Sequence, residues 1–375
     1  MKDHTNTTVL FTGYAPVHFV CFKPLYEWLA AMPGIDVFVS GGLRSKVDDQ
    51  TTYDLDALYG PLGVPENHRL SVEQIADLDV DFLFAANTKM ITPRSVGKRV
   101  QIFHGVSFRN KAVREDNANA DQYFIVGPYM RRAFANSGIL PEDDPRALNI
   151  GFMKTDRLIN GELDRMQTLQ HHGLTGERPV LVYAPTGQKH NSLETMGEKV
   201  IKKLAATNAF DLIIKPHDHP KKPINWTQRL EPLTGPHTVV SRESDVVTLL
   251  QAADVLITDA SSVSSEFSLA DRPMVFLDVP KLIATADAAA GSQVDLNTWG
   301  RRCGTIAGDP DQALTAVEQA LATPSAHSEI RQAMAADLFY NPGQATLAAL
   351  GWLKSQMSAQ TYYRNRRYHP MTNLM

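Results

Sequence analysis

Imidazole and ammonium side chains follow directly after short apolar runs at two places in the sequence. His104 follows one such run, and Lys215 and His217 follow another. A histidine at the end of a strand can act as a general base, because an ordinary pKa of about 6.5 leaves a neutral form at cellular pH. Lys215 can balance phosphate charge, and His217 can donate a hydrogen bond to a phosphoryl oxygen or protonate a leaving group.

Other interpretations of these residues stay open. His104 can equally be a structural histidine bonded to a loop carbonyl. The run His217-Asp218-His219 also contains metal-ligand types, although neighbouring residues on extended chain point in opposite directions. Asp79-Val-Asp81 matches the short acidic motif of metal-dependent nucleotide-sugar transferases, but it precedes an apolar run instead of following one. We therefore predict no metal site.

A third apolar run ends at Asp259 and is followed by Ser261 and Ser262, where a helix is expected to begin. Backbone N–H groups of a first helical turn have no intrahelical partners and favour anions, so these residues predict a phosphate site. Glu266, about one turn further on, can accept hydrogen bonds from a ribose diol. The alternative is an ordinary N-cap made by Asp259 or Ser262.

Two further residues belong to the same pattern. Gly105 follows His104 and allows close approach of the backbone to a ligand. Thr186 follows the apolar run Val180-Leu-Val-Tyr-Ala184 and is expected to face the same cleft, although such a sequence is also typical of a simple strand-to-helix turn. All of these residues except Glu266 lie where strands are expected to end.

Short apolar runs alternate with amphipathic stretches, which predicts parallel sheets covered by helices on both faces. The expected strands are Thr8–Thr12, Asp36–Ser40, Asp81–Ala85, Arg99–Phe103, Gln122–Val126, Val180–Ala184, Leu212–Lys215, Thr238–Val240, Val255–Thr258 and Met274–Leu277. The expected helices are Lys23–Met32, Tyr129–Ser137, Leu193–Ala206, Val246–Gln251, Ser264–Ala270, Asp311–Ala322 and Ala345–Gln356.

A length of 375 residues favours two domains. We predict an α/β protein of two doubly wound, Rossmann-like domains that face each other across a cleft, where ligands bind beyond the carboxyl ends of the strands. The predicted divisions are an N-terminal acceptor domain (1–150), a connector (151–176), a nucleotide-donor domain (177–330) and a C-terminal helix with a basic, aromatic tail (331–375).

Composition excludes several classes of protein. A net charge of −4 gives no general attraction to nucleic acid, so any polyanion must be bound locally. Cys21 and Cys303 form no redox or metal motif, which fits a reducing cytoplasm. We expect neither export nor a membrane span, because the N-terminus is polar and no apolar run approaches about 18 residues. The sequence has no P-loop motif and no Gly-x-Ser-x-Gly elbow.

Five motifs, in order, resemble the CDP-glycerol glycerophosphotransferase family, which polymerises teichoic-acid-type chains. They are Ile102-Phe-His-Gly105, Gly151-Phe-Met-Lys-Thr-Asp-Arg-Leu158, Tyr183-Ala-Pro-Thr186, Lys215-Pro-His217 and Thr258-Asp-Ala-Ser-Ser-Val263. The resemblance implies a GT-B fold with the donor nucleotide held mainly by the second domain. It also implies that His104 deprotonates the acceptor hydroxyl and that His217 contacts the donor pyrophosphate. By the same resemblance, Ser261 and Ser262 bind phosphate oxygens, and Glu266 lies near the nucleotide.

The implied reaction attacks the β-phosphorus of a CDP-linked alcohol, releases CMP and forms a phosphodiester without a metal or another cofactor. The implied partners are the CDP-alcohol and a hydroxyl acceptor on a glycan or lipid-linked chain of a cell-surface polymer. Ala260 stands where family members often have an aromatic residue. Asn341-Pro-Gly-Gln-Ala-Thr346 matches the family's C-terminal pattern only loosely, so recognition of the base or the acceptor is expected to differ.

Two other functions are compatible with the sequence. One is a GT-B glycosyltransferase or a UDP-sugar 2-epimerase, and the other is a nucleotide-binding module without catalysis. We expect a cytoplasmic protein. The tail Tyr362-Tyr-Arg-Asn-Arg-Arg-Tyr-His369 combines cations with aromatic rings, which is compatible with contact with the inner face of an anionic membrane or with a solvated end.

Overall fold

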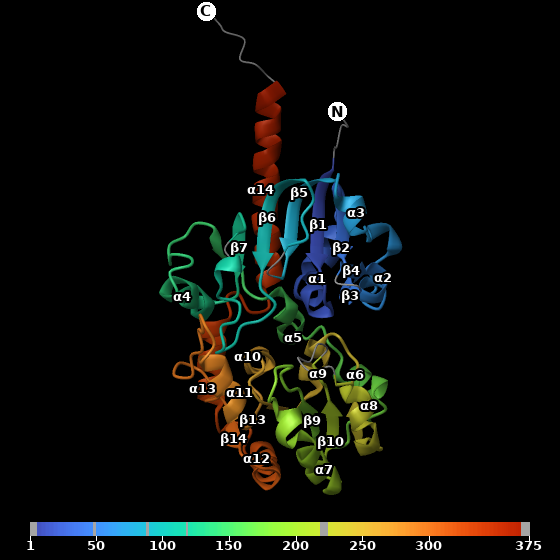
Figure 1. Cartoon of the computed structure of the whole chain (residues 1–375), viewed down its shortest axis with the longest axis vertical. Coiled ribbons are helices and arrows are strands. Elements are labelled where there is room, and N and C mark those ends of the chain that lie inside the picture. The colour runs from blue at the N-terminus through green and yellow to red at the C-terminus, as the bar shows by residue number, and fades with distance from the viewer. Residues whose placement is uncertain (1–5, 48–49, 88–89, 118, 218–223, 369–375) are drawn as a thin grey trace, which may run out of the picture.

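Two six-stranded parallel sheets lie one above the other in the computed structural model (Figure 1). The structure describes residues 6–47, 50–87, 90–117, 119–217 and 224–368. The α/β architecture predicted from the sequence is confirmed. None of the described helices is both long enough and apolar enough to span a bilayer.

The upper domain in Figure 1 has the strand order β2-β1-β5-β6-β7-β8. Its elements are β1 (Thr7–Gly13), α1 (Pro16–Ala30), β2 (Ile35–Gly41), β3 (Leu43–Val47), β4 (Gln50–Asp54), α2 (Leu55–Tyr59), α3 (Val72–Ile75), β5 (Asp79–Ala85), β6 (Ser95–Ile102), β7 (Gln122–Ile125), α4 (Pro128–Asn136) and β8 (Ala147–Asn149). The strand order reverses between β1 and β5, and the chain leaving β6 reaches His104 at the same edge of the sheet.

The lower domain has the order β11-β10-β9-β12-β13-β14, which reverses between β9 and β12. Its elements, with those of the connector, are α5 (Asp156–Ile159), α6 (Arg165–His171), β9 (Val180–Tyr183), α7 (Glu198–Ala206), β10 (Asp211–Ile214), α8 (Trp226–Leu230), β11 (Thr238–Val240), α9 (Val246–Ala252), β12 (Val255–Thr258), α10 (Val263–Ser268), β13 (Met274–Leu277), α11 (Pro280–Asp287), β14 (Thr305–Ala307), α12 (Pro310–Ala322) and α13 (Ser328–Leu338). Ligands of doubly wound sheets bind at such a reversal, so the ends of β9 and β12 are the expected location of a site.

The central strands are apolar throughout because both of their faces are covered. In β9, Val180 and Val182 belong to the core cluster that continues toward the upper domain, whereas Leu181 and Tyr183 belong to a second cluster on the opposite face. This pattern is typical of a parallel sheet between two layers of helices.

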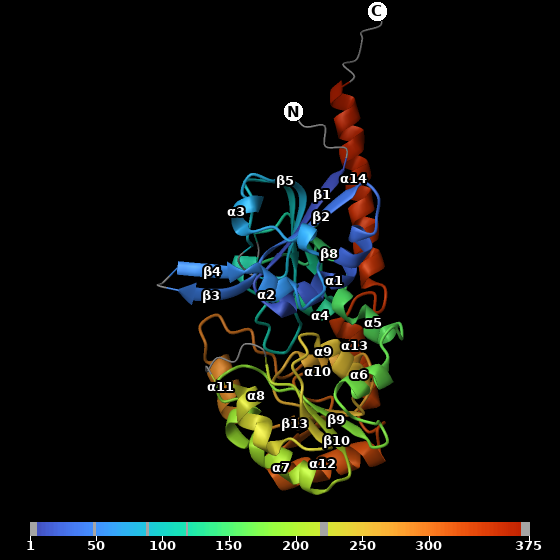
Figure 2. The same cartoon turned by 90° about the vertical axis from the view of Figure 1, so that its right-hand side faces the viewer.

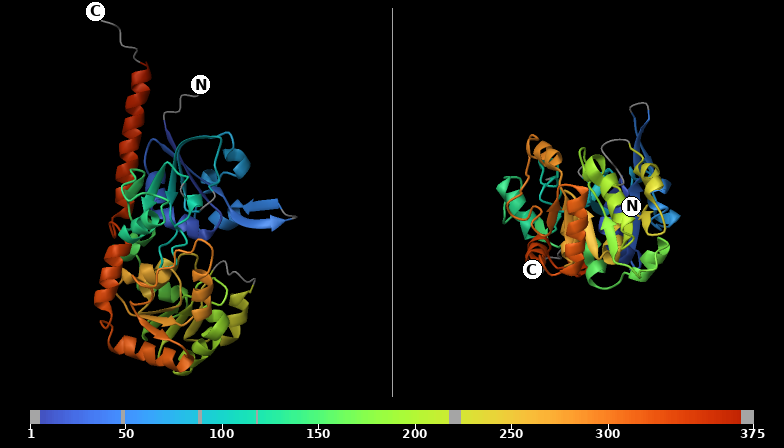
Figure 3. Two further views of the ribbon diagram at one scale, coloured as in Figure 1. Left: turned by 60° about the vertical axis from the view of Figure 1, so that its left-hand side comes forward. Right: turned by 90° about the horizontal axis from the view of Figure 1, so that it is seen from below.

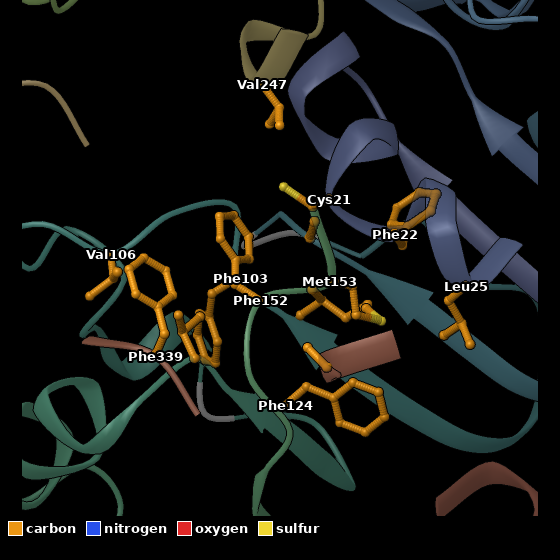
Figure 4. Packing of buried hydrophobic residues seen from close by; sticks show 14 of the residues in the cluster. Cys21, Phe22, Leu25, Phe103, Val106, Phe124, Phe152, Met153, Val247 and Phe339 are labelled. Atoms are coloured by element: carbon orange, nitrogen blue, oxygen red, sulfur yellow. The ribbon is translucent and has the colours of Figure 1, made fainter. Parts of the chain in front are cut away.

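One hydrophobic cluster joins the two domains through the connector (Figure 4). It contains Cys21 of α1, Phe103 after β6, Phe152 and Met153 of the connector, and Val247 of α9. Since large apolar side chains from all three parts share this core, burial of their surface stabilises the relative placement of the domains.

The chain crosses back to the upper domain after α13 and ends in α14 (Ala345–Tyr368), which runs along that domain and projects beyond it (Figures 2 and 3). Trp352 packs edge-on against Phe82 and Phe124 of the upper sheet, with ring centroids 6.0 and 5.2 Å away. The sequence predicted this helix only as far as Gln356. The observed helix continues into the basic, aromatic segment.

The antiparallel hairpin of β3 and β4 was not predicted and projects from the upper domain (Figure 2). Gly41 and Gly42 have φ values of +94° and +141°, and a Cβ on Gly42 would lie 2.5 Å from the carbonyl carbon of Asp54. These two glycines let the chain leave the sheet where a side chain would collide. The sequence also missed the strands β8 and β14 and the helices α2, α3, α8, α11 and α13. The predicted helix Leu193–Ala206 is divided into a wide turn at Leu193–Gly197 and α7.

Candidate active site

Residues that follow strands of both sheets line two adjoining cavities between the domains. The predicted site residues around the lower cavity are His104, Lys215, His217, Ser261, Ser262 and Glu266. Those around the upper cavity, of about 610 Å³, are His104, Gly105, Thr186, His217 and Ser262. Three of them, His104, His217 and Ser262, border both cavities. The structure therefore brings together every predicted site residue except Asp259.

His104 is held in one orientation by the upper domain. Its Nδ1 lies 2.8 Å from the carbonyl oxygen of Ala86, just after β5. Since a carbonyl only accepts, Nδ1 carries the proton, and in the neutral ring Nε2 is the basic nitrogen. The sequence analysis left open that His104 is a structural histidine bonded to a loop carbonyl, and the structure contains such a bond. The same bond leaves Nε2 free of a proton, so the ring can accept one there.

The surroundings of His104 favour its neutral form. The ring is exposed to the cleft, yet atoms of both domains surround it and displace much of the bulk water. This desolvation lowers the pKa of His104, the bond to Ala86 opposes the shift, and the charge of Lys154 adds to it. A neutral imidazole near physiological pH is the form that a general base requires.

The two domains meet where Gly105 faces Ser262. A Cβ on Gly105 would lie 3.1 Å from the hydroxyl oxygen of Ser262, which is tighter than ordinary contact. Glycine therefore permits the loop after β6 to approach the start of α10. The hydroxyl of Ser262 makes no cap hydrogen bond to α10, so the ordinary N-cap suggested by the sequence is not formed by this residue.

Asp259 directly follows the end of β12, as the sequence predicts. Its carboxylate is fully buried and accepts hydrogen bonds from the backbone N–H groups of Thr186, Ser192 and Ala260 and from the Ser192 hydroxyl. It lines neither cavity. Asp259 thus fixes the loop after β9 against the end of β12 and positions Thr186. Direct binding of phosphate by Asp259 stays a prediction that this geometry does not favour.

Glu266 forms a buried ion pair with Lys154, a residue of the connector to which the sequence assigned no role. The Lys154 ammonium lies 2.8 and 3.1 Å from the two carboxylate oxygens, and both side chains are almost fully buried. Burial alone would lower the pKa of Lys154, but the carboxylate more than offsets this and raises it. Both residues line the lower cavity, so Glu266 reaches a ligand as part of a pair and not as an isolated carboxylate.

Arg109 is the other residue that sequence reasoning missed. It follows His104 by five residues, its Nη2 donates to the Thr186 hydroxyl at 3.2 Å, and it lines the upper cavity. The signal in the sequence was a cation in the same loop as the predicted base. Lys154 had a comparable signal, since it lies inside one of the five motifs.

Ala260 is the residue for which the resemblance implies an aromatic side chain in relatives, and the structure shows what surrounds it. It is fully buried in a small cluster with Phe108 of the upper domain and Val279, Leu282 and Ile283 of the lower domain. The aromatic ring in this cluster therefore comes from the loop after His104.

The sequence left open a metal site at His217-Asp218-His219. Asp218 and His219 lie outside the part of the chain that the structure describes. Among the described residues, no three His, Cys, Asp or Glu side chains form a group able to hold a metal ion. Lys215 donates to the carbonyl oxygen of Pro216 at 2.8 Å and lines the lower cavity with His217.

The family model for CDP-Glycerol:Poly(glycerophosphate) glycerophosphotransferase matches residues 89–336, well over half of the sequence. The chain belongs to this family. The resemblance inferred from the five motifs is thereby confirmed, and so is the prediction of a transferase. No curated protein sequence matches the chain.

Solved structures relate this glycerophosphotransferase-family chain to two groups of proteins. The wall teichoic acid polymerase TagF superposes with a TM-score of 0.70 at 16% identity, covering 96% of this chain and 91% of that one. The UDP-GlcNAc 2-epimerase from Neisseria meningitidis bound to UDP-GlcNAc superposes with a TM-score of 0.56 at 13% identity, covering 93% and 100%. At these identities the likeness establishes the fold, and it confirms the predicted GT-B architecture.

Proposed function

We propose that the chain transfers glycerol phosphate, or a similar polyol phosphate, from a CDP-linked donor to an acceptor hydroxyl. The observation that carries the proposal is the position of His104, whose Nδ1 is fixed by Ala86 while the ring borders both cavities. A base at that boundary can act on an acceptor in one cavity and a donor in the other.

The donor diphosphate is proposed to lie in the lower cavity. Lys215, Ser261 and Ser262 line it and offer ammonium and hydroxyl donors to phosphate oxygens, and His217 borders it. The buried pair of Lys154 and Glu266 forms another part of its wall. Support for the nucleotide comes from the family, and a TagF structure soaked with CDPG is among the similar folds.

The chemical step then follows from these positions. The acceptor oxygen forms a bond to the β-phosphorus, and its proton passes to Nε2 of His104. The bond between that phosphorus and the bridging oxygen breaks, and CMP leaves with the electron pair. Lys215 and His217 stabilise the charge that develops on the phosphoryl and leaving oxygens.

Donor identity is the direct test. Thermal shift measurements with CMP and CDP against UDP and GDP should show stabilisation by the cytidine nucleotides, since a ligand that binds only the native state raises the melting temperature. Chromatography should then detect CMP released from CDP-glycerol or CDP-ribitol in the presence of an acceptor. Preferential binding of UDP, or epimerisation of a UDP-sugar, would assign the site to the other GT-B chemistry.

For the acceptor we propose a hydroxyl on a glycan or lipid-linked chain of a cell-surface polymer, used at the inner face of the membrane. The segment Tyr362–Tyr368 contains three arginines and three tyrosines at the end of the projecting α14. Co-sedimentation with vesicles containing anionic lipid should be lost when the chain is truncated after Gln356. Equal binding by the truncated chain would remove the tail from this role.

A further inference from the structure

A second histidine, His18, lies beside His104 in the wall of the upper cavity. The ring centroids are 5.4 Å apart, and the ring planes are inclined by 62°. His18 belongs to the first turn of α1, outside residues 89–336 that the family model matches. The proposed transfer step gives it no role, although an imidazole so close to a general base can affect the reaction.

Neighbouring residues of the upper domain hold the ring of His18 in place. It packs against the ring of Tyr14, with centroids 4.5 Å apart and the planes at 88°, and Arg44 in turn lies over Tyr14. A Cβ on Gly13 would lie 2.9 Å from Cβ of His18, so the glycine makes room for this side chain. His18 is only 5% exposed, yet it borders the cavity. The ring therefore presents one fixed orientation to a ligand.

Backbone groups fix opposite tautomers in the two histidines. The Tyr14 N–H donates to Nδ1 of His18 at 3.2 Å, so this nitrogen carries no proton and the neutral ring carries its proton on Nε2. In His104 the arrangement is reversed, with the proton on Nδ1 and a basic Nε2. While Nδ1 of His18 accepts from Tyr14, the ring cannot take up a second proton. His18 is therefore a hydrogen-bond donor and not a second base.

A hydroxyl group matches such a pair, because it donates one hydrogen and accepts at its lone pairs. Two hydrogen bonds that share one oxygen place their nitrogens about 4–6 Å apart, so one oxygen can lie between rings whose centroids are 5.4 Å apart. We propose that His18 binds the acceptor by donating from Nε2 to the attacking hydroxyl, while that hydroxyl gives its proton to Nε2 of His104. His18 keeps its own proton throughout. The proposal rests on the proposed transfer reaction and adds a residue that orients the attacking alcohol.

Two substitutions separate the donor at Nε2 from the bond to Tyr14. The amide nitrogen of Gln can replace Nε2, whereas the amide oxygen of Asn can replace Nδ1 and keep the bond to the Tyr14 N–H. With CDP-glycerol as donor and glycerol as acceptor, His18→Asn should raise the KM for glycerol roughly 3- to 10-fold, and His18→Gln should raise it less. His68→Gln is the matched control, because His68 also bonds through Nδ1, to the Tyr26 hydroxyl, and lines neither cavity. An Asn variant that works as well as the Gln variant would show that His18 only holds Tyr14, and would overturn the proposal.

Nitrogen NMR of the full chain with isotope-labelled histidines tests the contact without turnover. The signals of His18 and His104 are identified by their loss in His18→Gln and His104→Ala, and they should report opposite tautomers in the unliganded chain. Adding glycerol should shift the Nε2 resonances of both histidines. A shift at His104 alone, or at neither ring, would overturn the proposal. If the unmodified chain releases no CMP from CDP-glycerol, the transfer reaction fails, while the shifts at the two histidines still decide whether His18 binds an alcohol.

Discussion

His104 shows how one residue combines a structural bond with a basic nitrogen. We expect His104→Ala to lower kcat/KM by about 10²- to 10⁴-fold with nearly constant donor affinity, because a general base contributes to the transition state more than to binding. His327→Ala is the control, since His327 lines neither cavity. Unchanged turnover in His104→Ala would remove it from catalysis.

The same residue predicts a pH profile. A base works in its neutral form, so kcat/KM should fall as the pH drops through the pKa of His104. Because desolvation lowers that pKa, the acid limb should lie below the ordinary value of about 6.5. An acid limb above that value would contradict the environment described here.

For the Lys154–Glu266 pair, we expect that replacing one partner lowers the free energy of unfolding more than replacing both. Lys154→Met or Glu266→Leu alone leaves a buried charge without its partner and should lower the free energy of unfolding by about 3–5 kcal/mol. The double variant should recover much of this loss. Urea titration measures all three, with Arg132→Met of the more exposed Arg132–Asp337 pair as a control that should cost about 0–1 kcal/mol. Simple additivity of the two single changes would refute the coupling.

The site residues that were predicted can be recognised from their neighbours in the sequence, whereas the roles of those that were missed depend on contacts with distant residues. His104 and Lys215 were found because a polar residue directly after an apolar run reports the end of a strand, which is local information. The roles of Lys154 and Arg109 depend on Glu266 and Thr186, which are distant in the sequence. No periodicity or spacing reports such pairings.

At the scale of elements, α14 is attached by a cap that comes from the connector. The Asp156 carboxylate accepts hydrogen bonds from the N–H groups of Ala345 and Thr346, at 3.2 and 2.7 Å. We expect Asp156→Ala to cost about 1–2 kcal/mol and to increase hydrogen exchange in the first turn of α14. Asp309→Ala removes the corresponding cap of α12 and should leave exchange in α14 unchanged. Equal protection of α14 in both variants would show that the cap does not hold this helix.

The elements predicted well are the buried ones. Ten of the twelve strands in the two sheets were located to within a few residues, because continuous apolar runs between turn residues are typical of parallel strands covered by helices on both faces. The β3–β4 hairpin was not predicted, because residues such as Arg44, Ser45 and Thr52 are exposed and its sequence shows no apolar pattern. The short edge strands β8 and β14, of three residues each, give too few positions for a pattern to appear.

At the scale of the whole molecule, the cleft is bridged by the chain between α11 and β14. The Asp295 N–H donates to the Phe108 carbonyl at 2.7 Å, and the Asn110 side chain donates to the Gln293 carbonyl at 3.0 Å. The Tyr129 hydroxyl donates to the Asp295 carboxylate and accepts from Asn110. These bonds join the loop that carries His104 to the lower domain, so they couple the geometry of the base to closure of the cleft.

Tyr129→Phe tests this coupling with the loss of one oxygen atom. Removing a buried hydroxyl that makes two hydrogen bonds should lower the free energy of unfolding by roughly 1–3 kcal/mol. Tyr123→Phe is the matched control, because its buried hydroxyl accepts only from the Ala120 N–H inside the upper domain. Both variants should lose stability in urea titration, but only Tyr129→Phe should lower kcat and increase the radius of gyration by small-angle scattering, since only this hydroxyl bridges the domains. Equal effects on kcat in the two variants would mean that closure does not depend on the bridge.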